Sequence, residues 1–197
     1  MVCALALLAS VKEAEERMTM FAALLHSIVL GPGRRVVMAD LRGVASGAGF
    51  LNPRTLGATG NLVFEAKADI SVSEAELRLE AGILRAFNKH IDVIARQAEA
   101  FRRMAAANPF PEESARDGSL VGVRVMREPL RAGFEKALQE WRGEGERIAV
   151  VDGDLWVAFA GQPSKSRLLS RMSKQHLGIG TVRNWNTVRT LAAMIEG

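Results

Sequence analysis

Short apolar runs alternate with amphipathic segments along the first half of the chain. Met20 to Leu25 is an apolar run with the length of a buried strand. A helix is expected between about Val37 and Gly49, where a glycine is a suitable stop. Its inward face would be Leu41, Val44, Ala45 and Ala48. The other elements predicted for this half are strands at 54–56 and 62–64 around the turn Thr59-Gly60-Asn61, a helix opened by the capping box Ser73 and Glu76 with Leu77, Ala81, Leu84 and Phe87 inward, and a strand at 91–94.

The same order of elements begins again in the second half. A helix at 97–107 stops at Asn108-Pro109, and the stretch 108–118 is rich in Pro, Glu and Asp, as linkers are. The elements predicted beyond it are a strand at 120–126, a helix with Leu130, Phe134, Ala137, Leu138 and Trp141 in one stripe, strands at 147–151 and 155–159 around Asp152-Gly153, and a helix capped by Ser164 with Leu168, Leu169 and Met172 inward. The last strand is expected to be short or absent, with the terminal helix in its place.

The repeated order predicts an α+β protein with a duplicated ferredoxin-like fold. Each of two βαββα(β) halves would form an antiparallel sheet with helices on one face. A doubly wound parallel sheet is the alternative, but the two tight hairpins disfavour it because parallel neighbours need long crossovers. The predicted parts are an N-terminal extension at 1–18, a first half with its connecting helix at 19–107, a linker at 108–118, and a second half with a C-terminal helix at 119–197.

The chain ends in a glycine-containing loop followed by an amphipathic segment. The glycines of Gly178-Ile179-Gly180 can take left-handed dihedrals, and Thr181 is expected to cap a helix whose first turn carries Arg183 and Asn184. The buried stripe of this helix would be Trp185, Val188, Leu191, Ala192 and Ile195. Its other face would carry Arg183, Asn186 and Thr190, and its exposed start would offer backbone N–H groups to an anion.

Positive charge is concentrated near the C-terminus. The 197 residues carry a net charge of +4, but residues 164–197 contain six Lys or Arg and one acid, so the remainder is close to neutral. A local positive field suits an anionic partner, although a solvated helix face also explains it. The single cysteine, Cys3, excludes an internal disulfide and a cysteine-rich zinc site. The apolar run at 2–9 is too short to span a bilayer, so a cytoplasmic protein without membrane contact is expected.

Several motifs resemble the bacterial domain-of-unknown-function 1697 family over residues 20–194. They are Phe21-Ala22-Ala23-Leu24-Leu25, Met38-Ala39-Asp40-Leu41-Arg42 with Gly49-Phe50, Arg54-Thr55, Gly60-Asn61-Leu62-Val63-Phe64, Asn108-Pro109-Phe110, Pro163-Ser164-Lys165-Ser166 and, most specific, the run from Thr181 to Val188. The resemblance implies the duplicated ferredoxin-like architecture and brings no established activity, substrate or cofactor. Two loops depart from the family pattern, at 26–32 and at Ala58-Thr59; if these loops form a family site, this chain has lost polar groups from it.

The leading functional hypothesis is nucleic-acid binding without catalysis. Arg167, Arg171 and Lys174 are spaced i, i+4 and i+7 and would share one helix face that neutralises phosphates. The terminal helix would add Arg183, Asn184, Asn186 and Arg189. The sequence shows no RNA-reading motif and no exposed aromatic platform, because Trp141, Trp156 and Trp185 fit core positions.

Two further hypotheses stay open. A small-molecule enzyme could hold an anion between the halves with Arg34, Lys165 and Arg183, although a solvated turn explains Gly31-Pro32-Gly33-Arg34-Arg35 as well. A protein-interaction module could instead pair exposed sheet edges with another copy.

No catalytic residue, metal site or cofactor is predicted. The three histidines, His26, His90 and His176, have no metal-ligand spacing with one another. Asp152 and Asp154 flank Gly153 and are explained by a turn. The oligomeric state is not predicted.

Overall fold

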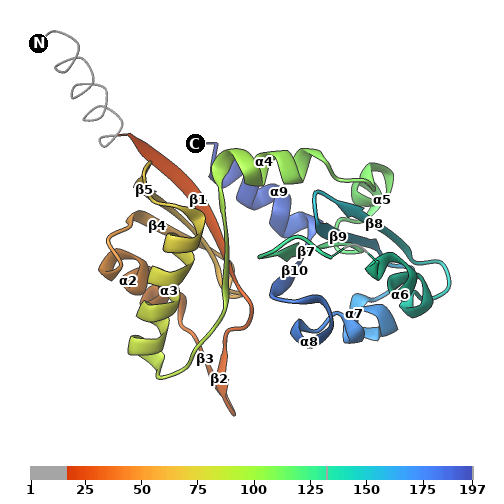
Figure 1. Ribbon diagram of the computed structural model, residues 1–197, viewed down its shortest axis with the longest axis horizontal. Coiled ribbons are helices and arrows are strands. Elements are labelled where there is room, and N and C mark those ends of the chain that lie inside the picture. The colour runs from red at the N-terminus through yellow and green to blue at the C-terminus, as the bar shows by residue number, and fades with distance from the viewer. Residues whose placement is uncertain (1–16, 132, 197) are drawn as a thin grey trace, which may run out of the picture. The chain divides into compact units, whose positions relative to one another are not determined.

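The protein is α+β and forms two compact units, shown in the computed structural model of Figure 1. The structure describes residues 17–131 and 133–196, so the predictions for Cys3 and the rest of 1–16 lie outside it. The first unit ends at Ala98 and the second begins at Glu99. The predicted linker at 108–118 lies within the second unit and carries helix α5 (Pro111–Arg116). Among the described residues, no helix is both long and apolar enough to cross a membrane.

The first unit contains the predicted order of strands and helices. Its elements are β1 (Met18–Leu25), β2 (Val29–Gly31), β3 (Arg34–Arg35), α2 (Met38–Gly47), β4 (Leu51–Leu56), β5 (Asn61–Lys67), α3 (Val72–Phe87) and β6 (Val93–Gln97). The main sheet is antiparallel with the order β4-β5-β1-β6, and Phe21 of β1 lies opposite Phe64 of β5. The predicted break at 31–35 is the turn of a small hairpin, in which β2 pairs with β3.

Helices α2 and α3 cover one face of this sheet (Figure 1). Between them and the strands lies a core that includes Leu41, Leu79 and Ile83. The ring of Phe64 stacks on Phe50, with centroids 4.3 Å apart, and on Phe21 at 5.4 Å. Burial of such large side chains is the main favourable term in folding, so this aromatic stack contributes to the core of the first unit.

The inward face predicted for α3 is wrong. Leu77 is 64% exposed and Leu84 is 47% exposed, and Ser71 rather than Ser73 caps the helix by accepting a hydrogen bond from the Glu74 backbone N–H. The face that packs on the sheet contains Ala75, Glu76, Leu79, Glu80, Gly82 and Ile83.

Two buried glutamates explain this rotation of the helix. Glu76 Oε1 accepts a hydrogen bond of 2.8 Å from the Ala95 backbone N–H, and Glu80 Oε1 accepts one of 2.9 Å from Val93. Strand β6 is an edge strand, so these N–H groups have no strand partner beyond it. Glu76 and Glu80 are four helix residues apart, which is a rise of about 6 Å, and Val93 and Ala95 are two strand residues apart, which is a rise of about 6.8 Å. The two carboxylates therefore have nearly the same spacing as the two outward N–H groups.

The second unit repeats the order and adds helices. Its elements are α4 (Ala98–Ala106), α5, β7 (Val121–Met126), α6 (Phe134–Trp141), β8 (Arg147–Val151), β9 (Asp154–Ala158), the 3₁₀ helix η1 (Pro163–Lys165), α7 (Arg167–Arg171), α8 (Lys174–Leu177), β10 (Gly180–Asn184) and α9 (Trp185–Met194). The antiparallel sheet has the order β10-β7-β9-β8. If the four strands of each main sheet are numbered 1 to 4 in chain order, the first sheet has the order 2-3-1-4 and the second has the order 4-1-3-2. These are the same order read from opposite edges of the sheet.

Helices lie on both faces of the second sheet, which departs from the predicted one-sided arrangement. Leu155 and Val157 of β9 pack in one core with Leu138 of α6 and Leu168 of α7, as the apolar spacing predicted. Trp156 points to the opposite face, where its ring lies 6.2 Å from that of Trp185 at the start of α9.

The end of the chain forms a strand before its helix, so the helix predicted to start at Thr181 is wrong. Residues Gly180–Asn184 pair with β7, with Thr181 opposite Val125. The helix starts at Trp185, and its cap is Asn184, whose Oδ1 accepts a 3.0 Å hydrogen bond from the Thr187 backbone N–H. Pairing with β10 satisfies one edge of β7, a gain that local capping signals do not show.

Candidate anion-binding surface of the second unit

Seven of the eight residues predicted to bind an anion belong to the second unit. They are Lys165, Arg167, Arg171, Lys174, Arg183, Asn184 and Asn186, whereas Arg34 is an exposed residue of the β2–β3 hairpin in the first unit.

Three of these residues have structural roles in the fold. Arg183 is 9% exposed, and its Nη1 donates to Thr181 Oγ1 at 2.7 Å and to the Val182 carbonyl at 2.9 Å. Burial lowers the pKa of Arg183 to about 10. Asn184 is the cap of α9, and Asn186 packs so closely on Gly118 that a Cβ there would lie 2.5 Å from its Oδ1. Arg183 is therefore not exposed together with Arg167 and Arg171, and the shared face predicted for Arg183, Asn186 and Thr190 does not form.

The predicted basic helix is interrupted. Helix α7 begins after its cap Ser166, ends at Arg171, and is separated by Met172 and Ser173 from α8, which begins at Lys174. Arg167, Arg171 and Lys174 therefore do not lie along one continuous helix, and the side chain of Lys174 is outside the described part. Arg167 and Arg171 are both exposed on α7 at the spacing i, i+4.

The environment of Lys165 is of mixed charge. Lys165 and Arg167 line a hollow of about 290 Å³ together with Glu144 and Glu146. Glu146 is buried, and its Oε2 accepts a 2.8 Å hydrogen bond from the Gly143 backbone N–H. Because two acids offset the two bases, this hollow is a weaker anion site than the charge of residues 164–197 suggested.

A tryptophan, an arginine and a histidine from three elements meet at one end of α6. The guanidinium carbon of Arg171 lies 5.9 Å from the centroid of the half-buried Trp141 ring, and the His176 ring lies 5.5 Å from it at 58°. We call Trp141, Arg171 and His176 the Trp141 cluster. Sequence reasoning placed Trp141 in the core, and the ring does pack partly against it, but α6 ends at this residue.

The orientation of His176 is fixed by its neighbours. Its Nδ1 lies 2.9 Å from Ser173 Oγ and 3.1 Å from the Arg171 carbonyl oxygen. A carbonyl oxygen only accepts hydrogen bonds, so the second contact requires the proton on Nδ1. Nε2 is then the nitrogen left for a partner.

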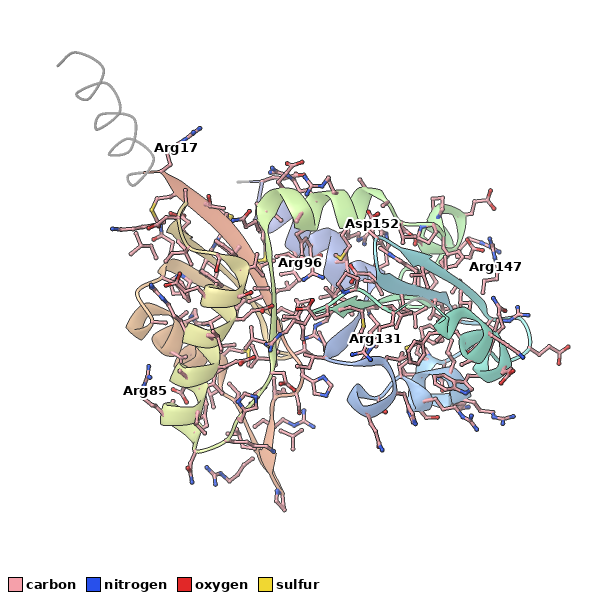
Figure 2. All side chains as sticks on the ribbon, viewed as in Figure 1. Arg17, Arg85, Arg96, Arg131, Arg147 and Asp152 are labelled. Carbon is pink, nitrogen blue, oxygen red and sulfur yellow. The ribbon has the colours of Figure 1, made fainter. Side chains whose placement is uncertain are left out.

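A pocket of about 280 Å³ lies beside the Trp141 cluster and shares His176 with it. We call it the Arg131 pocket; its lining residues are Arg127, Glu128, Pro129, Arg131, Phe134, Gln175, His176, Leu177, Gly178 and Ile179. The lining contains two arginines and a histidine against one acid. Figure 2 shows the Arg131 side chain extending between α6 and α8. No local sequence signal marks this pocket, because its walls come from two segments about 50 residues apart.

A buried arginine lies behind one wall of the pocket. Arg124 of β7 is 3% exposed, and its Nη2 donates a 2.9 Å hydrogen bond to the carbonyl of Gly178. Its Nε has no hydrogen-bond partner among the described residues, and burial lowers the pKa of Arg124 to about 10. Gly180 leaves the space for this side chain, since a Cβ there would lie 3.1 Å from Arg124 Nε and 2.9 Å from the Val125 carbonyl oxygen.

One group of possible metal ligands lies in the first unit. Ligand atoms of Glu80, His90 and Asp92 lie within 4.8 Å of one another, and His90 Nε2 is 3.3 Å from Asp92 Oδ1. The sequence prediction of no metal site rested on the spacing of the histidines alone, whereas this group joins one histidine to two carboxylates. Glu80 already accepts the Val93 N–H, so the position of its carboxylate has a structural explanation.

The two aspartates around Gly153 are turn residues, as the sequence predicted. Asp152 has a positive φ of 50°, and Asp154 Oδ1 accepts a 2.7 Å hydrogen bond from the Met126 backbone N–H.

Comparison with known proteins agrees with the sequence motifs between Phe21 and Phe110, whereas the motifs at 163–166 and 181–188 lie beyond the residues that the family model matches. The family described as "Protein of unknown function (DUF1697)" matches residues 18–156. The chain belongs to this family. The fold of this DUF1697 protein is similar to that of the conserved bacterial protein SP0830 from Streptococcus pneumoniae, with a TM-score of 0.70 and 22% sequence identity over 91% of this chain and 99% of the other. A search of curated proteins found no match.

Proposed function

We propose that the second unit of this DUF1697 protein binds a single-stranded nucleic acid, as a binding protein rather than an enzyme. The observation that carries the proposal is the Trp141 cluster, in which an arginine and a histidine both lie near a half-buried tryptophan ring. Exposed Arg167 lies one helical turn before Arg171 and adds a second cation.

The chemistry of this cluster suits an unpaired strand. Proteins that bind single strands combine cations that follow the phosphates with aromatic rings on which bases stack. The exposed part of Trp141 offers such a ring, and Arg171 and Arg167 offer the cations. A double helix would keep its bases stacked on each other, so this small aromatic site favours a single strand.

The first functional alternative receives less support from the geometry. An anion site of Arg34, Lys165 and Arg183 needs an accessible Arg183, but this side chain is buried and bound to Thr181 and Val182.

The proposal is tested by fluorescence anisotropy with a labelled single-stranded oligonucleotide of about twelve nucleotides, in RNA and DNA forms. Base stacking on an aromatic ring is worth about 1–3 kcal/mol, so Trp141→Ala should weaken binding about 5-fold to 150-fold. Arg171→Glu should weaken it at least tenfold, because a cation is replaced by an anion near phosphates.

Arg85→Glu is the matched control, since Arg85 is an exposed arginine of α3 in the first unit (Figure 2). It makes the same charge change and should alter the affinity less than about twofold. Absence of binding by the wild-type protein at low salt, or an equal loss in Arg85→Glu, would contradict the proposal. Circular dichroism would show that each variant is folded.

We also infer that the two units are copies of one ferredoxin-like fold. The support is the shared βαββαβ order together with the shared strand order of the two main sheets. On this view the nucleic-acid surface belongs to one copy, because the first unit has no counterpart of the Trp141 cluster among its described residues: its aromatic stacking pairs are the buried Phe21, Phe50 and Phe64.

A further inference from the structure

We propose that the Arg131 pocket binds a phosphate monoester. This inference goes beyond the proposed function and does not rest on it, since a small phosphorylated molecule could enter the pocket even if no strand bound the Trp141 cluster. The shared chemistry is a terminal phosphate group, from either a free small phosphate ester or the phosphorylated end of a strand.

The pocket has a defined frame. One wall is the loop that follows β7, and the other is α8 with the loop to β10. The Arg127 backbone N–H donates a 2.9 Å hydrogen bond to the Ile179 carbonyl, which joins the two walls. The Leu130 N–H donates to the Gly153 carbonyl at 2.9 Å and ties the first wall to the β8–β9 turn. A volume of about 280 Å³ is at the small end of ligand pockets and fits a compact group.

Two side chains of the lining can donate hydrogen bonds to a ligand. Arg131 makes no hydrogen bond or ion pair with any residue that the structure describes, so its planar fork is available for bidentate contact with an oxyanion. His176 has its Nδ1 engaged by Ser173 and Arg171, and its Nε2 becomes a donor when the ring is protonated.

The buried Arg124 adds a field that solvent screens poorly. Its guanidinium contacts the carbonyl of Gly178, which is a lining residue, and no carboxylate lies against it in the described structure. A buried cation without a counter-ion is costly to the fold, and a nearby dianion would offset that cost. Arg124 therefore raises the positive electrostatic potential behind the pocket wall, although its side chain is not exposed to the ligand.

These donors discriminate between phosphate classes. A monoester carries close to two negative charges near neutral pH and has three terminal oxygens, which match the donors of an arginine fork. An internal phosphodiester has one charge and two substituents, so it gains less from the same groups. The Glu128 carboxylate on the lining repels any anion, and a dianion more than a monoanion, so the attraction of the lining cations and of Arg124 must outweigh this repulsion.

The test is a titration of ¹⁵N-labelled protein with methyl phosphate, a monoester, and with dimethyl phosphate, a diester, following the amide signals of Gly178 and Ile179. We expect methyl phosphate to saturate these shifts and dimethyl phosphate to bind at least tenfold more weakly. Arg131→Ala and His176→Gln should each weaken methyl phosphate binding at least fivefold. Lys136→Ala is the control, because Lys136 is an exposed cation of the same helix α6 that does not line the pocket.

Equal affinity for the two esters, or unchanged affinity in both pocket variants, would overturn the proposal. A trinucleotide with and without a 5′-phosphate then identifies the source of the phosphate group. If only the phosphorylated trinucleotide binds more tightly than methyl phosphate, the ligand is the end of a strand. If the phosphorylated trinucleotide binds no more tightly than methyl phosphate, the ligand is a free small ester. Arg167→Glu should weaken strand binding while leaving the methyl phosphate affinity within about twofold, so failure of the strand proposal and failure of the pocket proposal are distinguishable.

Discussion

Arg124 is the residue at which stability and the proposed binding are opposed. It is 3% exposed on the central strand β7 and makes one hydrogen bond, to the Gly178 carbonyl, while its Nε has no partner among the described residues. Replacement of buried charges by apolar side chains of similar volume is often stabilising. Arg124 therefore destabilises the fold, and it also supplies positive electrostatic potential behind the proposed pocket.

Arg124→Met should stabilise the protein by about 1–2 kcal/mol and raise its Tm by about 2–8 °C, because the methionine fills the same space without a charge. The same variant should bind methyl phosphate more weakly. Burial lowers the pKa of Arg124 to about 10 in the folded state, below its ordinary value, so the destabilisation is full below about pH 10 and is relieved as the pH rises above it. Urea unfolding at neutral pH measures the change, and a less stable Arg124→Met would contradict it.

At the scale of elements, the contact between α3 and β6 depends on a ladder of two carboxylates. Glu76 and Glu80 accept the Ala95 and Val93 N–H groups, so loss of either side chain leaves a buried donor unsatisfied. We expect Glu76→Ala and Glu80→Ala each to destabilise the protein by about 1–3 kcal/mol in urea unfolding. Glu74→Ala is the control: this exposed residue pairs with Arg78 on the same helix, and its loss should cost at most about 1 kcal/mol. Equal effects at Glu74 and Glu76 would contradict the role of the ladder.

This ladder also shows why sequence reasoning failed for α3 and succeeded elsewhere. Apolar spacing selected Leu77 and Leu84 for the core, but the buried face includes two glutamates that only a neighbouring edge strand makes favourable. The β4–β5 and β8–β9 hairpins were predicted because their turns are set by local glycines and polar residues. Strand β10 was missed because its stability comes from pairing with β7, which is over 50 residues away.

For the whole molecule, net charge alone did not predict which cations are accessible. The excess of Lys and Arg in residues 164–197 includes Arg183, which is buried, and Lys165, which faces two glutamates. The Trp141 cluster draws its residues from α6, α7 and α8, and no sequence spacing joins them. Charge concentration therefore identified the second unit, whereas the particular surface required the fold.

The most direct test of the proposed surface is the salt dependence of single-strand binding. For single strands, log Kobs falls with log[salt] by about 0.7 for each phosphate that a cation neutralises. The double variant Arg167→Glu/Arg171→Glu should therefore lower the slope by about 1.4 relative to the wild type over a series of about 50 to 300 mM salt, with Arg85→Glu unchanged. A wild-type protein that does not bind at the lowest salt, or a double variant with the wild-type slope, would contradict the assignment of the nucleic-acid surface to α6–α8.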